Sequence, residues 1–400
     1  MTELKLRLKP GKERRLRGGH PWVYSNEVDV AATPLKGMAA GAVAVVEDSR
    51  GNPLGVAGVS PNSLICARLY SRDPNQKLDT NFLHQRLQAA LAQREQAYPG
   101  GCYRLCYGDA DGLPGLVVDR FGDYLAVQLA TTTMDQMQDQ VVKTLVELID
   151  PKGILLRNMG PFRQQEGLPE SVEVAFGDVP ETVEITENNT RFMVPLLAGQ
   201  KTGWFYDHRE NRALLQRLCP GKSVLDVFSY AGGWGVEALT AGAGSACCVD
   251  ASEEALNAAA ASAELNGVAS QFSGRQGKAA EVLKAMAAEK QQFDIVVLDP
   301  PAFIKRRKDI RQGEKAYHQI NQLAIKVLAP GGLLVSASCS MHLSEAMLMD
   351  VVRQAGSRSG RQLQVIASGG AGLDHPLHPA IPETRYLKAI FAKEVIDAQQ

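Results

Sequence analysis

The feature that most constrains the fold of this chain is a series of short, largely apolar segments separated by helical ones, which begins after Val183. These segments span residues 222–228, 246–250, 293–299 and 332–338. Strands that are apolar on both faces require helices on both sides of their sheet. We therefore predict a doubly wound α/β domain with a parallel sheet over residues 183–400.

Two smaller domains are expected before it, because 400 residues suggest two or three domains in all. Residues 1–73 contain short stretches of period-two alternation, such as 4–8 and 42–47, with turn residues between them. This pattern predicts a small, barrel-like β domain. Residues 74–182 combine a helical pattern with hairpin signals and predict a small α+β domain.

Composition excludes several classes of protein. Hydrophobic residues at 45% and charged residues at 22% are ordinary globular values, which argues against a disordered or collagen-like chain. No apolar run approaches the length of a membrane span. The 7 cysteines lack paired metal-ligand spacing, so we expect reduced thiols in a cytoplasmic protein that holds no metal.

Charge is distributed unevenly along the chain. The formal net charge of −1 argues by itself against a nucleic-acid partner, but it averages over two basic runs. Glu13 is the only acid within the first run and Asp309 the only one within the second. Either run could be an ordinary solvated surface, yet two together favour patches that meet phosphate. The candidate RNA-binding residues are Lys5, Arg7, Lys12, Arg14, Arg15, Arg17, Lys305, Arg306 and Arg307.

The ends of the first two strands predict a cofactor site, because ligands bind beyond the carboxyl ends of such strands. The glycine-rich loop after Asp226 lacks the spacing of the dinucleotide fingerprint, and Asp226 would repel phosphate but balance a cationic amino-acid group. Asp250, 24 residues after Asp226, could receive both hydroxyls of a ribose. A ligand with an ammonium, a ribose and no phosphate is S-adenosylmethionine. The loop and strand-end candidates are Phe228, Ser229, Tyr230, Gly232 and Ala251.

Less specific interpretations stay open for these residues. A glycine after a first strand often serves packing alone, and an aspartate at a strand end is often a helix cap. A nucleotide-dependent dehydrogenase is the competing enzyme class, and Asp299 at the end of a further strand favours the methyltransferase over it.

Two residues point to the reaction. Asp299, followed by Pro300 and Pro301, ends one apolar strand, and Cys339 ends the next. Cytosine C5 is too poor a nucleophile to accept a methyl group unaided, whereas addition of a thiolate at C6 makes C5 reactive. Cys339 is the candidate nucleophile, and Asp299 would bind the exocyclic amine and N3 edge of the base. The alternative is a structural Cys339 in a tight turn.

These residues resemble those of the bacterial ribosomal RNA large-subunit methyltransferase I family over essentially the whole chain. The matching segments are residues 19–25, 111–120, 201–209, 228–233, 299–301 and 338–340. The segments 201–209, which begins at Lys201, and 338–340 are the specific ones. The resemblance implies an N-terminal PUA RNA-binding domain, a catalytic Rossmann-like domain, and synthesis of 5-methylcytidine in 23S rRNA.

The resemblance also extends the site. It makes Cys339 the nucleophile and Asp299 its supporting acid. It adds to the cofactor pocket Thr202, Phe205, Asp207 and Arg209. One departure concerns the adenine, since relatives often carry an acidic residue where this chain has Gly277 and Lys278. Lys278 cannot accept a hydrogen bond from the adenine amine, so a backbone carbonyl is expected there.

The predicted partner is 23S rRNA, and a homodimer is compatible with the sequence. A target cytosine must be unstacked to reach the nucleophile, and the basic runs could offset that cost through phosphate contacts. Two other functions stay open. One is methylation of another nucleobase atom, such as an exocyclic amine, and the other is a non-catalytic RNA-binding assembly factor.

Overall fold

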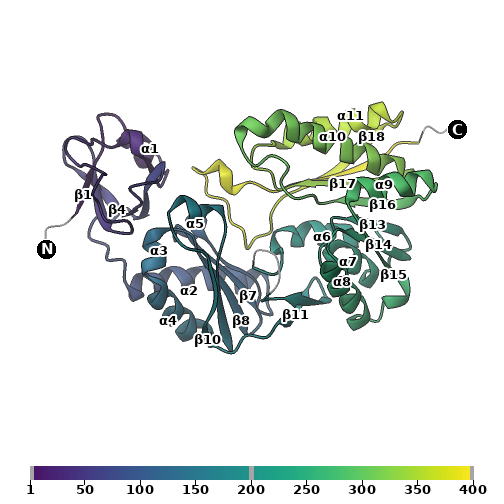
Figure 1. The fold of residues 1–400 in the computed structure, drawn as a ribbon, viewed down its shortest axis with the longest axis horizontal. Coiled ribbons are helices and arrows are strands. Elements are labelled where there is room, and N and C mark those ends of the chain that lie inside the picture. The colour runs from purple at the N-terminus through teal and green to yellow at the C-terminus, as the bar shows by residue number, and fades with distance from the viewer. Residues whose placement is uncertain (1–3, 198–201, 397–400) are drawn as a thin grey trace. The chain divides into compact units, whose positions relative to one another are not determined.

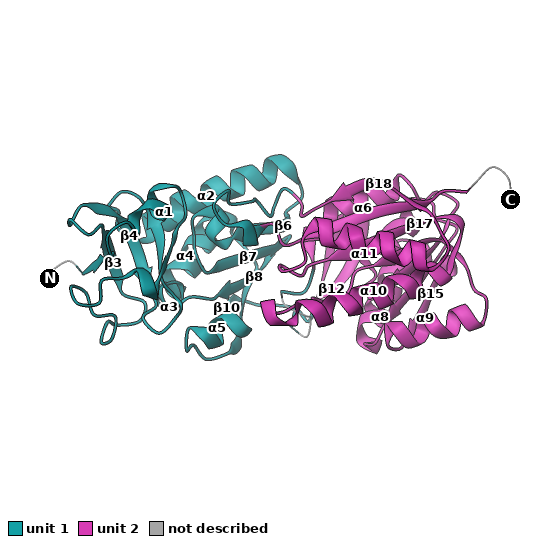
Figure 2. Ribbon diagram, turned by 90° about the horizontal axis from the view of Figure 1, so that it is seen from above, with its two compact units in different colours: residues 1–181, 196–204, 373–384 teal, residues 182–195, 205–372, 385–400 magenta. Residues whose placement is uncertain are grey.

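The computed structural model describes residues 4–197 and 202–396, and the chain forms two compact units (Figure 2). Unit 1 contains residues 1–181, 196–204 and 373–384, and unit 2 contains residues 182–195, 205–372 and 385–400. Each unit has its own hydrophobic cores. The division of the chain into domains of residues 1–73, 74–182 and 183–400 stays a prediction from the sequence.

The first part of unit 1 is a small sheet, of which Figure 1 labels β1 and β4. Its strand order is β1-β3-β4-β5-β2. Its elements are β1 (Lys5–Arg7), α1 (Glu13–Arg17), β2 (Trp22–Tyr24), β3 (Val43–Glu47), β4 (Pro53–Val59) and β5 (Ile65–Ser71). The alternation noted in the sequence places Leu6, Leu8 and Val46 in one core with Leu16 of α1. The predicted small β domain is confirmed.

The second part of unit 1 is a mixed sheet with the order β10-β9-β8-β7-β6. The strands are β6 (Cys102–Tyr107), β7 (Leu116–Phe121), β8 (Tyr124–Leu129), β9 (Gly153–Asn158) and β10 (Ser171–Gly177). The helices are α2 (Thr80–Ala97), α3 (Thr132–Gln136), α4 (Gln138–Ile149) and α5 (Pro161–Gln165). Leu87 of α2 and Leu145 of α4 share a core with Leu125 and Val127 of β8, as an α+β arrangement requires.

Polar contacts join the two parts of unit 1. Trp22 Nε1 donates a hydrogen bond of 2.8 Å to Asp109 Oδ1. Arg68 forms a buried ion pair of 3.0 Å with Glu166. Burial raises the pKa of Asp109, so its bond to Trp22 is the main compensation for removing that carboxyl from water. The segment that contains Trp22 therefore has a structural role within unit 1.

Unit 2 contains a doubly wound sheet with the order β15-β14-β13-β16-β17-β19-β18 (Figure 1). The sheet strands are β13 (Ser223–Val227), β14 (Ser245–Asp250), β15 (Phe272–Gln276), β16 (Phe293–Leu298), β17 (Leu328–Ser338), β18 (Leu363–Gly369) and β19 (Lys388–Glu394). A separate hairpin precedes it, formed by β11 (Thr182–Glu187) and β12 (Thr190–Pro195). The prediction of a parallel sheet holds for β13 to β17, and β19 adds an antiparallel strand beside β17.

Helices cover both faces of this sheet. They are α6 (Arg209–Gln216), α7 (Gly233–Thr240), α8 (Glu253–Leu265), α9 (Ala279–Ala288), α10 (Ile310–Lys326) and α11 (Glu345–Arg358). Val224 and Val297 pack with residues of α6 and α7 on one face. Leu225 and Leu298 pack with residues of α9, α10 and α11 on the other. The strand order reverses between β13 and β16, and ligands of such sheets bind beside that point.

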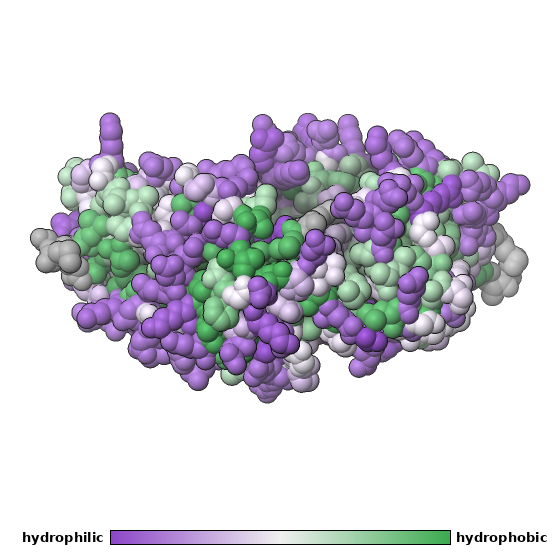
Figure 3. All heavy atoms as spheres, turned by 60° about the horizontal axis from the view of Figure 1, so that its bottom comes forward, coloured by the Kyte–Doolittle hydropathy of each residue, from purple (hydrophilic) through white to green (hydrophobic). Residues whose placement is uncertain are grey.

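The surface is mixed. The face drawn in Figure 3 is largely hydrophilic, with apolar areas between the polar side chains. Within the described part of the chain, no helix is both long enough and apolar enough to cross a membrane. Across the same residues, no cluster of three or more histidine, cysteine or acidic side chains is arranged to hold a metal ion.

Candidate active site

The loop after β13 has a strained backbone. Phe228 and Tyr230 have φ angles of 67° and 47°, in the left-handed region that residues with a Cβ rarely adopt. The amides of Phe228 and Ser229 both donate to the carbonyl of Val249, which holds the loop against β14. Gly232 then caps α7 with a φ of 78°. Strain of this kind clusters at ligand sites, which agrees with the predicted position of the cofactor.

Asp226 lies beneath this loop and is completely buried. Its Oδ2 accepts a hydrogen bond of 2.9 Å from the amide of Gly235, the third residue of α7. Its Oδ1 is buried and has no hydrogen-bond partner among residues 4–197 and 202–396. Burial raises the pKa of Asp226 to about 7. A buried carboxylate oxygen without a donor fits a cationic ligand group, and the ammonium group of S-adenosylmethionine meets that requirement.

Asp250 ends β14 and connects the loop to the next strand. Its Oδ2 accepts from the amide of Tyr230 at 2.9 Å, and its Oδ1 accepts from the amide of Ser252 at 2.9 Å. Each carboxylate oxygen can accept a second hydrogen bond, so the group can still receive ribose hydroxyls. Asp250 pairs in register with Gln276 of β15, and its carbonyl accepts from the amide of Gly277.

The residues predicted near the adenine adjoin Asp250. Ala251 is exposed, and its carbonyl accepts a bond of 3.3 Å from Gln276 Nε2. Lys278 is 81% exposed and pairs at 3.8 Å with Glu281, one turn along the same segment. The long side chain of Lys278 thus extends into solvent.

The segment that precedes α6 contributes further predicted residues. The Phe205 ring contacts that of Tyr230 edge to face, at 5.5 Å between centroids. Tyr386, next to β19, donates a hydrogen bond to Asp207 Oδ2. Arg209 is buried and donates to Glu187 at 3.2 Å, so part of its guanidinium group holds the β11–β12 hairpin.

Thr202 belongs to unit 1, where its hydroxyl donates to Asp119. Asp119 is buried, and Arg104 donates two hydrogen bonds of 2.8 Å to it. Thr202 therefore has a structural contact of its own. Lys201, which the family resemblance also singled out, lies outside the described residues.

Asp299 follows β16 and lies between two side chains from other elements. His208 Nε2 is 3.2 Å from Asp299 Oδ1, and Trp234 Nε1 donates a bond of 3.2 Å to Asp299 Oδ2. Burial lowers the pKa of His208, but the carboxylates of Asp299 and Asp207 outweigh it, and the net pKa is raised.

Cys339 follows β17, the neighbour of β16 in the sheet. Its Sγ lies 4.0 Å from the carbonyl oxygen of Pro300, in the loop that begins at Asp299. The serines on either side of it are tied to Tyr317 of α10, whose hydroxyl is 2.8 Å from both Ser338 Oγ and Ser340 Oγ. This network fixes the backbone on both sides of the thiol.

The proline loop has its own support. The amide of Ile304 donates to Ser340 Oγ at 3.1 Å, which ties this loop to the one that carries Cys339. The Phe303 ring contacts Tyr317 at 4.8 Å and Phe228 at 6.3 Å between centroids. Two aromatic neighbours therefore already contact the Phe303 ring.

Several residues of the site carried no recognised signal in the sequence. His208 and Trp234 lie in or next to segments that matched the family, residues 201–209 and 228–233. The sequence spacing does not indicate that their side chains approach Asp299. Tyr317 sits on an amphipathic helix, where an aromatic residue usually indicates core packing. Tyr386 and Lys388 come from the end of the chain and reach the site only because β19 pairs with β17.

The two basic runs differ in their surroundings. Lys5 and Arg7 both pair with the buried Glu47, Arg15 pairs with Glu27, and Arg17 pairs with Asp48. Glu13 is the only acid within the first run, but the fold brings further acids to it from other segments. Lys305, Arg306 and Arg307 are all exposed, and Arg306 forms only an exposed pair with Asp309.

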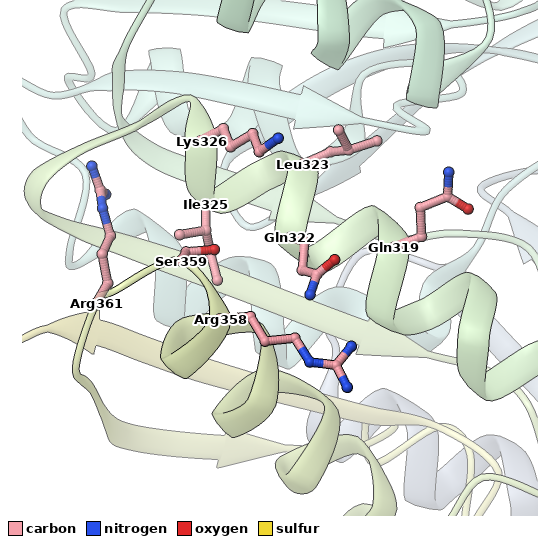
Figure 4. Close-up of a pocket in the computed structure, with 8 residues that line it drawn as sticks. All are labelled: Gln319, Gln322, Leu323, Ile325, Lys326, Arg358, Ser359 and Arg361. Atoms are coloured by element: carbon pink, nitrogen blue, oxygen red, sulfur yellow. The ribbon is translucent and has the colours of Figure 1, made fainter.

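A cavity of about 480 Å³ in unit 2 lies away from these residues (Figure 4). It is lined by Gln319, Gln322, Leu323, Ile325, Lys326, Arg358, Ser359 and Arg361. Arg361 Nη1 donates to the carbonyl of Leu328, the first residue of β17, whereas Cys339 follows the last. The cavity is thus at the opposite end of β17 from the predicted site and contains none of its residues.

Comparisons with known proteins agree with this geometry. Residues 6–72 match the model of the PUA-like domain. Residues 162–364, more than half of the chain, match the model of the S-adenosylmethionine-dependent methyltransferases. A ribosomal RNA large subunit methyltransferase I from Shewanella denitrificans is 34% identical over 98% of this chain and 99% of its own. The enzyme of that name from Cronobacter sakazakii is also 34% identical, over 96% of this chain and 98% of its own.

The chain belongs to the ribosomal RNA large subunit methyltransferase I family. Membership confirms the predicted PUA-like and methyltransferase domains and makes S-adenosylmethionine the methyl donor. Two solved structures have the same fold as this chain. A Streptococcus mutans protein described as a SAM-dependent methyltransferase covers 98% of it with a TM-score of 0.82 at 20% identity. SMU.776, described as a methyltransferase complexed with SAH, gives 0.83 at 20% identity.

Proposed function

We propose that this chain methylates C5 of a cytosine in large-subunit ribosomal RNA, with Cys339 as the nucleophile. The observation that carries the proposal is the position of Asp299 and Cys339, which follow the neighbouring parallel strands β16 and β17. They lie at the same edge of the sheet as Asp226 and Asp250, because parallel strands present their carboxyl ends together. The names of the relatives supply the class of substrate.

The cofactor is assigned to the strand ends of β13 and β14. Asp226 Oδ1 would accept from the ammonium group, and Asp250 would accept from the ribose hydroxyls. The remaining proposed contacts come from Thr202, Phe205, Asp207, Arg209, Phe228, Ser229, Tyr230, Gly232, Ala251, Gly277 and Lys278. When bound, S-adenosylmethionine supplies an electrophilic methyl group on a sulfonium.

The reaction is covalent catalysis by the thiolate of Cys339. Its sulfur forms a bond to C6 of the cytosine, and the electron pair of the C5–C6 double bond becomes available at C5. C5 then takes the methyl group, and the electrons of the broken bond stay on the donor sulfur. The proton on C5 leaves to water, the bond between C6 and Cys339 breaks, and the thiolate is restored.

Asp299 would hold the base during addition. Its carboxylate can bind the exocyclic amine and the N3 edge, where positive charge and a proton must be accommodated as the adduct forms. His208 and Trp234 fix the two oxygens of Asp299 from the side of the protein. The side chain of Asp299 is 23% exposed, so it can still meet a base from solvent.

The substrate must also be bound through its backbone. The exposed residues Lys305, Arg306 and Arg307 follow the Asp299 loop directly, and phosphate contacts there could offset the cost of unstacking the target base. The N-terminal candidates Lys12 and Arg14 form no ion pair within residues 4–197 and 202–396, and we propose them as a second contact. The cytoplasm is the proposed compartment of the reaction.

Replacement of the thiol tests the proposal. Ribosomal RNA from a strain that lacks this protein is incubated with the purified chain and S-adenosylmethionine, and its nucleosides are identified by mass spectrometry. Cys339→Ala should lower 5-methylcytidine formation by about a thousandfold or more, because loss of a covalent nucleophile removes the main pathway. Cys247→Ala, at the other partly exposed cysteine, is the matched control and should stay close to wild type.

Binding of SAH to both variants shows that they are folded. RNA that carries 5-fluorocytosine gives an independent readout, because fluorine at C5 leaves no proton to remove and the adduct at Cys339 should persist. Continued formation of 5-methylcytidine by Cys339→Ala would contradict the proposal. A methylated exocyclic amine as the product of the wild-type chain would instead support the competing reaction, with Cys339 in a structural role.

A further inference from the structure

A buried lysine lies beside the loop of Cys339. Lys388 begins β19, and it pairs in register with Ser338 of β17, the residue before Cys339. Its ammonium group donates hydrogen bonds of 2.7 Å to the carbonyls of Ser340 and Tyr386. Lys388 exposes 5% of its surface. The residue before Cys339 thus pairs with Lys388 in the sheet, and the carbonyl of the residue after Cys339 accepts from the Lys388 ammonium group.

The charge of Lys388 is only partly compensated. Within the described part of the chain Lys388 forms no ion pair with a carboxylate, although buried cations normally have such a partner. Two carbonyl oxygens occupy two of the three donors of its ammonium group. A buried lysine in this state is costly unless a negative charge forms close to it.

The titratable groups around Lys388 indicate which negative charge could balance its ammonium group. Burial lowers the pKa of Lys388 to about 8, while Cys339 and Glu345 both oppose that lowering. Glu345, at the start of α11, already pairs with Arg385 at 3.3 Å. The Tyr317 hydroxyl of α10 bonds the serines before and after Cys339, and burial raises the pKa of that hydroxyl, which keeps it neutral. The thiol of Cys339 is therefore the group near Lys388 whose ionisation would balance the buried cation.

We propose that Lys388 is a positioning residue for Cys339, whose ammonium group fixes the Ser340 carbonyl and favours the thiolate form of the cysteine. The inference rests on the proposed function in taking Cys339 as the nucleophile. The thiolate, and not the thiol, adds to C6 of the base, so its population at neutral pH sets the rate of addition. Lys388 touches neither base nor cofactor in this role.

The test measures the reactivity of Cys339 without substrate. The full-length chain is treated with iodoacetamide over a range of pH, and the thiolate sulfur displaces iodide to give a stable thioether. Mass spectrometry of the peptide that contains Cys339 follows this residue alone. Lys388→Met and Lys388→Gln remove the charge, Lys388→Arg keeps it, and Lys393→Met changes an exposed lysine on the same strand as the matched control.

We expect the midpoint of alkylation against pH to rise by about one unit or more in the Met and Gln variants, so that the rate at pH 7 falls about tenfold. Lys388→Arg should restore a midpoint near that of the wild type, and Lys393→Met should leave it unchanged. The methylation rates of Lys388→Met and the wild type should converge as the pH rises toward 9.

A folded Lys388→Met or Lys388→Gln chain with the midpoint and rate of the wild type would overturn the inference. That result differs from failure of the proposed function, which appears as persistent 5-methylcytidine formation in Cys339→Ala. A loss of methylation in Lys388→Met that is equal at every pH would show a purely structural role and would also count against the inference.

Discussion

Burial determines the chemistry of the individual residues at the site. Asp226 and His208 are both enclosed, yet their pKa values rise for different reasons. No group in residues 4–197 and 202–396 forms a hydrogen bond with Asp226 Oδ1, and desolvation dominates and disfavours the charged form of Asp226. His208 faces two carboxylates, whose attraction for a proton exceeds the effect of desolvation. The proposed cofactor site thus contains a carboxylate that burial makes costly to ionise.

Asp226→Asn tests this consequence. The ordinary pKa of the carboxyl is 3.8 and the folded value is about 7, so the folded chain binds more protons than the unfolded chain between these values. The wild type therefore loses stability as the pH rises from about 4 to above 7. The variant should lack that loss and, without ligand, should melt a few degrees higher than the wild type at pH 8. Its affinity for SAH should fall by about tenfold or more.

Thermal unfolding at pH 5 and pH 8 and calorimetric titration with SAH measure the two effects. Asp294→Asn on β16 is the matched control with the opposite sign. Hydrogen bonds from Ser223 lower the pKa of Asp294, so its stabilising effect is present above its unfolded pKa and is lost in acid. That variant should be less stable than the wild type at neutral pH. Unchanged SAH affinity in Asp226→Asn would show that Oδ1 does not face the ammonium group.

At the scale of elements, the first turn of α7 lies unusually close to the sheet. A Cβ on Gly235 would lie 2.6 Å from Cys248 Sγ and 3.4 Å from Asp226 Oδ2. Cys248 is completely buried on β14 and cannot move aside freely. The glycine therefore lets the helix approach β13 and β14 and brings the Gly235 amide to the Asp226 carboxylate.

Gly235→Ala sets two effects against each other. Relative to glycine, alanine inside a helix raises the free energy of unfolding by up to about 1 kcal/mol. The overlap of its Cβ with the buried Cys248 sulfur lowers that free energy by about 1–3 kcal/mol. The overlap should dominate because both neighbours are buried, and the free energy of unfolding should fall, together with the affinity for SAH. Urea denaturation measures the first and calorimetry the second.

Gly274→Ala on β15 serves as the control for that comparison, since the nearest atoms to its Cβ would be at 3.8–3.9 Å, which is ordinary contact. It should have little effect on stability or on SAH affinity. An equally stable Gly235→Ala chain would show that α7 can shift away from the sheet without loss, and the close approach would then have no energetic role.

At the scale of the whole molecule, the distribution of charge matters more than its sum. The total of −1 contains basic residues that the fold neutralises and others that it leaves exposed. Glu47 pairs with both Lys5 and Arg7, so part of the N-terminal run stabilises the first sheet. The run from Lys305 to Arg307 has mainly solvent around it. Phosphate would therefore meet the second run at a lower cost.

The two runs should differ in their effect on RNA binding. Replacement of Lys305, Arg306 and Arg307 by alanine should weaken binding to ribosomal RNA and lower the slope of log K against log salt by about 2. Replacement of Lys5, Arg7 and Arg17 should change that slope less and should reduce the thermal stability of the chain more, because their acidic partners lose their counter-charges. Binding isotherms at several salt concentrations separate the two variants, and equal slopes would contradict the distinction.

The sequence alone determined the architecture of the catalytic unit and the strand-end residues. Apolar strands that alternate with helices permit little other than a doubly wound sheet, and the topology brings Asp226, Asp250, Asp299 and Cys339 to one edge. These predictions depended on the pattern of apolar residues over short windows, which can be seen in the sequence itself.

The tertiary structure alone decided which groups surround those residues. His208 and Trp234 reach Asp299, and Tyr317 and Lys388 reach the loop of Cys339, from positions far away in the chain. The pairing of the N-terminal cations with distant acids is of the same kind. No periodicity records such contacts, because they arise from the packing of whole elements, and packing is also what removes water and sets the charge of each group.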